Sequence, residues 1–152
     1  MQRPSASSLV ILLVVLVSAT ISVRSVWMSA DGNGWKSIVR SDVKGYYGYL
    51  QALFVRHDLG HEPDQWEFVR HMPTGTLNKY FCGTSIMMAP WFAAGRQLAL
   101  LDPDAPRDGL SSYELKAIGV GAWAYLLLGL LAMRALLLGM GARDAVVAWT
   151  II

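Results

Sequence analysis

The stretch Ala117–Met133, AIGVGAWAYLLLGLLAM, contains seventeen consecutive residues without a charged side chain. A helix needs about 20 predominantly apolar residues to cross the hydrocarbon core of a bilayer. The wider segment Leu115–Leu138 reaches that length if Arg134 lies near an interface. We therefore expect a membrane-spanning helix within residues 113–140. Its glycines, at positions 119, 121 and 129, are typical of a helix that packs closely against another helix.

A second apolar stretch lies near the amino terminus. Leu9–Val23 has fifteen uncharged residues, and Leu9–Met28 reaches spanning length if Arg24 extends to the headgroups and Trp27 acts as an interfacial anchor. A cleaved signal peptide is the alternative, because Arg3 precedes the apolar core and small residues follow it. The helix within residues 113–140 favours a membrane protein, and hence a first membrane helix within residues 1–30.

The composition agrees with this prediction and excludes other classes of protein. Only 16% of the residues are charged, whereas soluble domains average about 25%. A net charge of +2 without a basic cluster argues against a nucleic-acid partner. The chain has one cysteine, Cys82, so an internal disulfide is excluded. Membrane lipid is the partner that the composition predicts.

Residues 31–112 join the two predicted spans and lie on one side of the membrane. Arg3 precedes the first span, and Arg134 and Arg143 lie at the far end of the second. Positive residues favour the cytoplasm, so we expect both ends inside and residues 31–112 outside. Residues 141–152 begin another apolar run, from which we expect a truncated hydrophobic segment and a fragment of a larger helical bundle.

Two parts of this outer segment have the pattern of helices that lie along a membrane surface. Apolar residues of Trp35–Phe54 recur at helical spacing, which predicts an amphipathic helix over about residues 35–56. A second helix is expected over about residues 84–101. Pro90 and Arg96 interrupt it, so we interpret it as an interfacial helix, with a full span as the alternative. The predicted fold class is therefore an all-α membrane protein with two transmembrane helices.

Asp42 breaks the apolar pattern of the first interfacial helix. By helical spacing it lies inside the apolar arc, between Val39 and Tyr46. A carboxylate in that position is costly unless its charge is stabilised. It is therefore a candidate catalytic base or a ligand for a divalent cation. The alternatives are a salt bridge with a nearby Lys or Arg, or the N-cap of a helix that starts later.

Other polar residues carry weaker signals. His57 and His61 have the i, i+4 spacing of two metal ligands on one helix face, but Gly60 lies between them and no third ligand follows at a recognisable spacing. We interpret them as solvated loop histidines and predict no zinc site. Lys79 precedes an aromatic pair, which is typical of a headgroup anchor. Its alternative role is contact with the phosphate of a lipid-linked ligand.

The segments SDVKGYYGYLQALF (Ser41–Phe54), HDL (His57–Leu59) and NKYFCGTSIMMAPWF (Asn78–Phe92) carry a resemblance. Together with the first helix, the long loop and the next helix, they resemble the amino-terminal part of bacterial C-type polytopic glycosyltransferases. These enzymes are related to the protein O-mannosyltransferase and aminoarabinose transferase families. The resemblance covers most of residues 9–140.

The resemblance implies an enzyme of the bacterial inner membrane that transfers a sugar from a polyprenyl-phosphate donor to an extracytoplasmic acceptor. Asp42 matches the family's acidic residue, the base or metal-binding carboxylate. Lys79 matches the basic residue beside the donor phosphate, and Tyr46 and Tyr47 are expected to line the sugar or prenyl site. A fragment of this length is expected to be inactive alone.

Two alternatives from other classes of protein remain open. The first is a small non-catalytic membrane subunit whose two helices pack against a larger membrane protein. The short length of the chain and the glycines of the second predicted span motivate this alternative. The second is a secreted or anchored binding module, which would follow from cleavage of a signal peptide.

Overall fold

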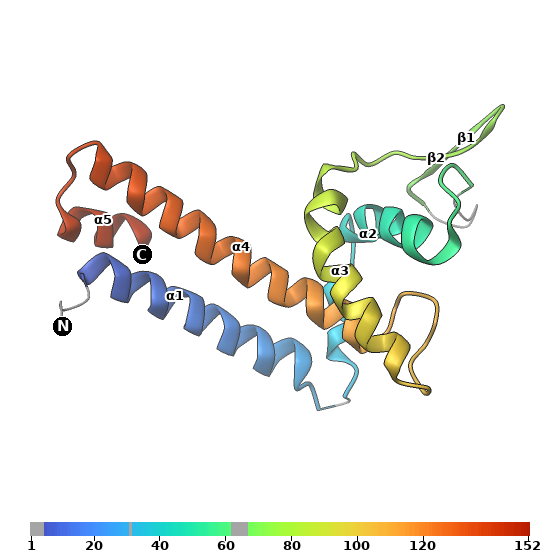
Figure 1. The fold of residues 1–152 in the computed structure, drawn as a ribbon, viewed down its shortest axis with the longest axis horizontal. Coiled ribbons are helices and arrows are strands. Elements are labelled where there is room, and N and C mark those ends of the chain that lie inside the picture. Colours follow the sequence, from blue (N-terminus) through green and yellow to red (C-terminus); the bar gives the residue numbers. More distant parts are fainter. Residues whose placement is uncertain (1–4, 31, 62–66) are drawn as a thin grey trace.

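A computed structural model describes residues 5–30, 32–61 and 67–152. The chain is mostly helical, and it has the shape of a long helix pair with a cluster of shorter elements at one end (Figure 1). Helix α1 (Ala6–Ser22) continues as a π-helical turn to Trp27, and it runs beside α4 (Ser112–Gly139). The shorter elements belong to the segment that joins these two helices.

The two long helices have the length and composition of membrane spans. The most apolar 18-residue windows within Ala6–Trp27 and Ser112–Gly139 have mean hydropathies of 2.5 and 1.8. Only 11% and 6% of their most apolar windows are buried, so neither is the core helix of a soluble domain. The prediction of two long apolar helices is confirmed. Their insertion into a bilayer stays a prediction.

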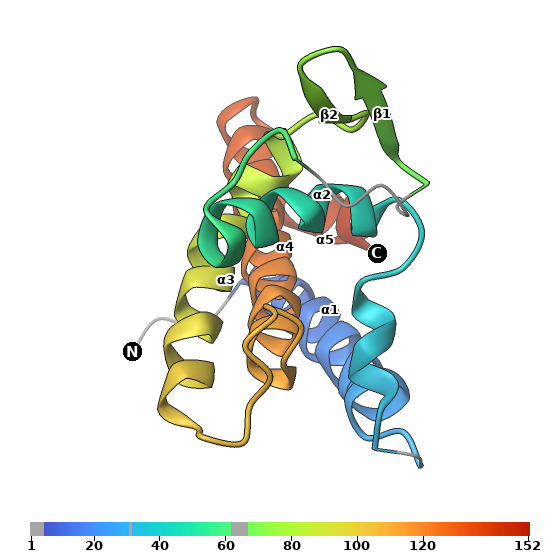
Figure 2. The ribbon, with the colours of Figure 1, turned by 90° about the vertical axis from the view of Figure 1, so that its right-hand side faces the viewer.

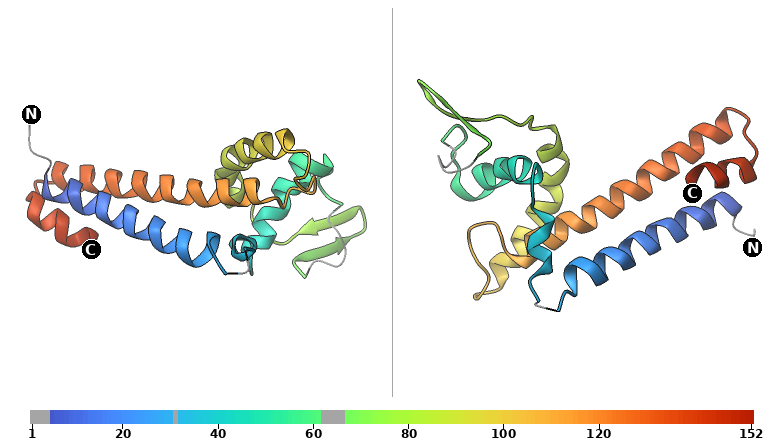
Figure 3. Two further views of the ribbon diagram at one scale, coloured as in Figure 1. Left: turned by 90° about the horizontal axis from the view of Figure 1, so that it is seen from below. Right: turned by 180° about the vertical axis from the view of Figure 1, so that it is seen from behind.

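At the far end of this pair, the short helix α5 (Asp144–Ile151) turns back against α1 (Figure 3). The Asp144 carboxylate accepts hydrogen bonds from the hydroxyl and from the backbone N–H of Ser7, the latter at 3.2 Å. Arg134 donates from Nε to the Ser7 hydroxyl at 2.7 Å. The Ser7 hydroxyl holds the pKa of Asp144 below its usual value. Beneath these polar contacts lies an apolar cluster centred on Ile11, Val147 and Ile151.

The predicted single helix over residues 35–56 is wrong in its extent. The chain instead forms a 3-10 helix (Gly34–Ile38), then α2 (Val43–Gln51), which ends in a π-helical turn (Ala52–Arg56). The break falls at Ser41, whose φ of 48° lies in the left-handed region. An α-helix cannot continue through that conformation, so the helical phase of residues 35–39 does not carry over into α2.

This change of phase selects a different inner face for α2. Tyr47 and Leu50 are its buried large side chains, at 1% and 2% exposure, whereas Leu53 of the π-helical turn that follows is 51% exposed. Tyr47 and Leu50 pack with Phe92, Leu115 and Ile118 in the main apolar core. This core therefore joins α2 to the helices that follow it in the chain.

A small sheet departs from the all-α expectation. Strand β1 (Val69–Met72) pairs antiparallel with β2 (Gly75–Asn78), with Val69 opposite Asn78. The hairpin projects from the end of the molecule beyond α2 (Figure 1). Two short strands bury little apolar surface, so the alternation that predicts a strand is weak here.

Helix α3 (Gly83–Leu101) occupies the range in which the second interfacial helix was expected. It includes Pro90, and it is not one of the two candidate spans in the described part of the chain. It crosses the first turns of α4 and packs against α4 more extensively than any other pair of elements does (Figure 2). Its position at a membrane interface stays a prediction.

The crossing of α3 and α4 depends on a glycine and a buried ion pair. A methyl group at Gly95 would lie 2.7 Å from Cα of Glu114, so only glycine allows this approach. Arg96 Nη1 lies 3.0 Å from Oε1 of Glu114, whose side chain is fully buried. The other carboxylate oxygen accepts from the N–H of Ser111 at 2.8 Å, which caps α4. Both carboxylate oxygens are therefore satisfied inside the protein.

We predict that Arg96→Met destabilises the fold by about 3–5 kcal/mol, because the Glu114 carboxylate would stay buried without its partner. Chemical denaturation of the detergent-purified protein, followed by tryptophan fluorescence, measures this loss. Arg40→Met is the matched control, since Arg40 is exposed. Equal midpoints for the two variants would contradict the structural role of the pair.

Candidate functional site

The two longest segments that carry the resemblance are far apart in the sequence and lie against each other in the structure. Asn78 is buried and donates from Nδ2 to the Gly45 carbonyl of α2 at 2.7 Å. The Tyr49 hydroxyl donates to the Tyr80 carbonyl at 2.6 Å, and the Ser85 hydroxyl donates to the Tyr46 carbonyl at 2.6 Å. These bonds fix the segment around residue 80 on the outer side of α2.

Tyr80 brings a hydroxyl to Asp42. Its ring lies so close to Gly45 that a Cβ there would come within 2.1 Å of the ring, and its hydroxyl donates to Asp42 Oδ1 at 2.6 Å. Asp42 is exposed and occupies the N-cap position of α2, without a capping bond from its side chain. The predicted place of Asp42 inside an apolar arc is therefore wrong, because the helix begins after it.

Tyr46 and Lys79 lie around the same tyrosine. The rings of Tyr46 and Tyr80 meet edge to face with centroids 5.1 Å apart. Nζ of Lys79 lies 5.5 Å from the Tyr80 ring centroid, within the range of a cation–π contact. We call Asp42, Tyr46, Lys79 and Tyr80 the Asp42 cluster. It combines an exposed carboxylate, a cation and two aromatic rings at the surface of the outer segment.

Tyr47 lies apart from this cluster. Its side chain is buried, its ring meets Phe92 edge to face at 5.5 Å, and its hydroxyl donates to the Gly109 carbonyl. Burial is the main cause that raises the pKa of Tyr47 well above its usual value. Of the four residues singled out in the sequence, the structure thus brings three together and places Tyr47 in the core.

The structure offers no ready-made metal centre among the residues it describes. No group of three His, Cys, Asp or Glu side chains in this part of the chain could hold an ion together. His57 ends the π-helical turn in a left-handed conformation, and His61 bonds to Asp58 at 2.7 Å. The two histidines therefore do not share a helix face, and Asp42 has the Tyr80 hydroxyl as its neighbour.

A cavity of about 790 Å³ opens beside α2. One wall comes from Trp35, Lys36, Lys44 and Gln51, and the facing wall comes from the loop 102–111 and the first turns of α4. Tyr47 lines this cavity, whereas Asp42 and Lys79 do not. This cavity was not predicted from the sequence, although the three aspartates within residues 102–112 could have indicated a polar site there.

Two hydrogen bonds shape this cavity by tying the loop to α2. The hydroxyl of Tyr47 reaches Gly109, and Nε2 of Gln51 donates to the Asp108 carbonyl at 3.0 Å. Gly109 has a φ of +81°, and a Cβ there would press against Val55 at 2.9 Å. A residue without a side chain is therefore needed at this point of the loop.

Comparisons of the chain with models of protein families, with curated proteins and with solved structures find no match.

The hydrogen bond between Tyr80 and Asp42 should change the pH at which the Tyr80 hydroxyl ionises. The accepting carboxylate is the largest cause that raises the pKa of Tyr80 above its usual value of 10.0. The bond therefore stabilises the fold below pH 10 and is lost as the pH rises through the higher folded value. In Asp42→Asn, we expect one tyrosine to ionise at a lower pH in an absorbance titration. Asp58→Asn is the control, and identical curves for wild type and Asp42→Asn would refute the contact.

Proposed function

We propose that this chain is the amino-terminal portion of an integral membrane glycosyltransferase. The enzyme moves a sugar from a polyprenyl-phosphate donor to an acceptor outside the cytoplasm. The observation that carries the proposal is the convergence of two segments, Ser41–Phe54 and Asn78–Phe92, on one surface. These are the segments that resemble C-type glycosyltransferases, and Asp42 of the first and Lys79 of the second both contact the side chain of Tyr80.

The proposed chemistry gives each polar residue of the Asp42 cluster a separate role. The acceptor oxygen forms a bond to the anomeric carbon of the sugar as its proton passes to the Asp42 carboxylate. The bond from that carbon to the phosphate oxygen breaks, and the polyprenyl phosphate leaves with the electron pair. Lys79 stabilises the negative charge on the phosphate. Tyr80 holds the carboxylate in place, and its bond of 2.6 Å to Asp42 supports that role.

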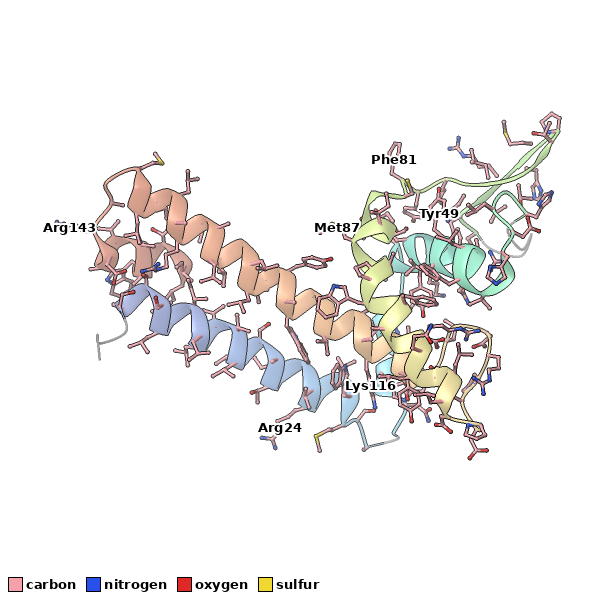
Figure 4. The ribbon with its side chains drawn as sticks, viewed as in Figure 1. Arg24, Tyr49, Phe81, Met87, Lys116 and Arg143 are labelled. Carbon is pink, nitrogen blue, oxygen red and sulfur yellow. The ribbon has the colours of Figure 1, made fainter. Side chains whose placement is uncertain are left out.

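The distribution of charges and aromatic rings supports a membrane location with the outer segment at one surface. Arg24 and Lys116 lie at the end of the helix pair nearest the outer segment, and Arg143 lies at the opposite end (Figure 4). Trp27 stacks near Trp123 with centroids 5.1 Å apart, and Nζ of Lys116 lies 6.0 Å from the Trp27 ring. Such a group is typical of the headgroup level of a membrane. We propose the bacterial inner membrane, with residues 31–112 outside.

The alternative proposal is a non-catalytic subunit that packs against a larger membrane protein. Gly129 favours it, because nothing lies within 4 Å of a Cβ built there and the surface of α4 is open to another helix. Gly119 and Gly121 do not contribute, since Trp27 and Trp91 of the same chain cover them. Further helices of the same enzyme could also pack on this open surface of α4. The surface is therefore consistent with the first proposal as well.

Replacement of the carboxylate tests the catalytic role. We expect Asp42→Asn to lower the transfer rate about 100- to 10,000-fold, because a general base contributes a factor of that size. The assay uses membranes that contain the protein expressed from its intact gene, and it follows a radiolabelled sugar from polyprenyl phosphate to acceptor.

Asp58→Asn is the matched control, because Asp58 is an exposed carboxylate of the same outer segment that pairs with His61. We expect this variant to keep its rate. An Asp42→Asn protein that turns over at the wild-type rate would remove the catalytic proposal. Activity that is lost equally in both variants would also speak against a specific base.

The exposed Cys82 allows a test of topology without an engineered residue. We expect a membrane-impermeant maleimide to label Cys82 in cells whose inner membrane is intact. In a Cys82→Ser background, a cysteine in place of Arg143 should react only after the membrane is permeabilised. The reverse pattern would place the segment 31–112 in the cytoplasm.

A further inference from the structure

The cavity beside α2 has the composition of a ligand site and lies outside the Asp42 cluster. Its volume of about 790 Å³ falls within the range of about 300–1,000 Å³ that is usual for small-molecule sites. The floor is apolar and includes Val39, Leu110 and Leu115. Tyr113 and Trp35 add aromatic rings, whose polar groups donate to Asp102 and to the Gly32 carbonyl, and such rings suit the apolar face of a ligand.

The charged groups of the cavity come from both of its walls. Lys36 and Lys44 belong to the wall formed by residues 35–51, and Nζ of Lys36 lies 5.4 Å from the centroid of the Trp35 ring. Asp102, Asp104 and Asp108 come from the facing loop. The Asp102 carboxylate accepts from the Tyr113 hydroxyl at 3.1 Å and from the Asp104 backbone at 3.1 Å, so its place is fixed.

This arrangement selects against a ligand with a strong net charge. The lining contains three aspartates and two lysines, so an anion would lie near carboxylates and a cation near ammonium groups. Like charges in a partly enclosed site repel each other by more than they would in water. A neutral ligand with many hydroxyls avoids this cost, because each hydroxyl can donate to a carboxylate and accept from an ammonium.

We propose that the cavity between α2 and the loop 102–111 binds a neutral saccharide. The ring of Trp35 contacts an apolar face of the sugar, Asp104 and Asp108 accept from its hydroxyls, and Lys44 donates to its oxygens. The proposal goes beyond the proposed transfer reaction, since Asp42 does not line this cavity.

Direct binding tests the site. The protein from the intact gene is purified in a detergent without a sugar headgroup, because a glycosidic detergent would compete. Neutral oligosaccharides of glucose, galactose and mannose are the probes, with glucose 1-phosphate and inorganic phosphate as charged probes. Saturation-transfer NMR detects the bound sugar, and tryptophan fluorescence reports the contact with Trp35. We expect at least one neutral oligosaccharide to bind and the phosphates to bind more weakly.

Variants locate the binding in the cavity. Asp104→Asn replaces an exposed carboxylate and should weaken binding about tenfold, since one charge-assisted hydrogen bond is lost. Trp35→Ala should abolish both binding and the fluorescence change. The matched controls are Asp58→Asn and Trp149→Ala, because both residues are exposed and neither lines the cavity. They should bind as the wild type does.

Three outcomes would overturn the proposal. The first is that no neutral oligosaccharide binds, and the second is that only the phosphorylated probe binds. The third is binding that Asp104→Asn and Trp35→Ala leave unchanged. Asp42→Asn separates this proposal from the transfer reaction, because saccharide binding should persist in that variant while transfer is lost. Failure of one proposal therefore does not imply failure of the other.

Discussion

The buried ion pair between Arg96 and Glu114 holds the outer segment onto the long helix pair. Glu114 lies in the first turn of α4, the second candidate span, and Arg96 belongs to the helix that crosses it. A buried carboxylate without a partner costs several kcal/mol, so the two helices are fixed in the one arrangement that brings these groups together. Gly95 permits the close approach that the pair requires. Helix α2 packs against α3, and the 3-10 helix Gly34–Ile38 packs against α4.

The Asp42 cluster and the cavity use opposite sides of one short helix. On one side, Asn78 and Tyr80 fix the segment that carries Lys79 against α2. On the other, Tyr47 and Gln51 fix the acidic loop that closes the cavity. Because both sets of contacts depend on α2, a shift of this helix would disturb the two sites together. The proposed catalytic and binding functions thus share a structural support without sharing a lining residue.

Sequence periodicity predicted helical structure over residues 35–54 but did not predict where the helix breaks. Residues 35–54 have an apolar repeat that a single helix would satisfy, and this repeat placed Asp42 on the buried face. A left-handed residue at Ser41 ends the repeat, and no spacing rule detects one such residue. The catalytic role of Asp42 stays a prediction, and its surroundings differ from those expected. It lies at a helix start, exposed, with a tyrosine from a distant segment as its partner.

The two long apolar helices could be predicted from the sequence alone, because a long apolar stretch is a local property that needs no knowledge of the rest of the chain. The sequence also pointed to Asp42, Tyr46 and Lys79 as chemistry-bearing residues. The three-dimensional fold was needed to show that Tyr80 contacts Asp42, that Tyr47 belongs to the core, and that the acidic loop and α2 line one cavity. These features arise from contacts between residues more than thirty positions apart. A pattern read along the chain carries no information about which distant segments meet.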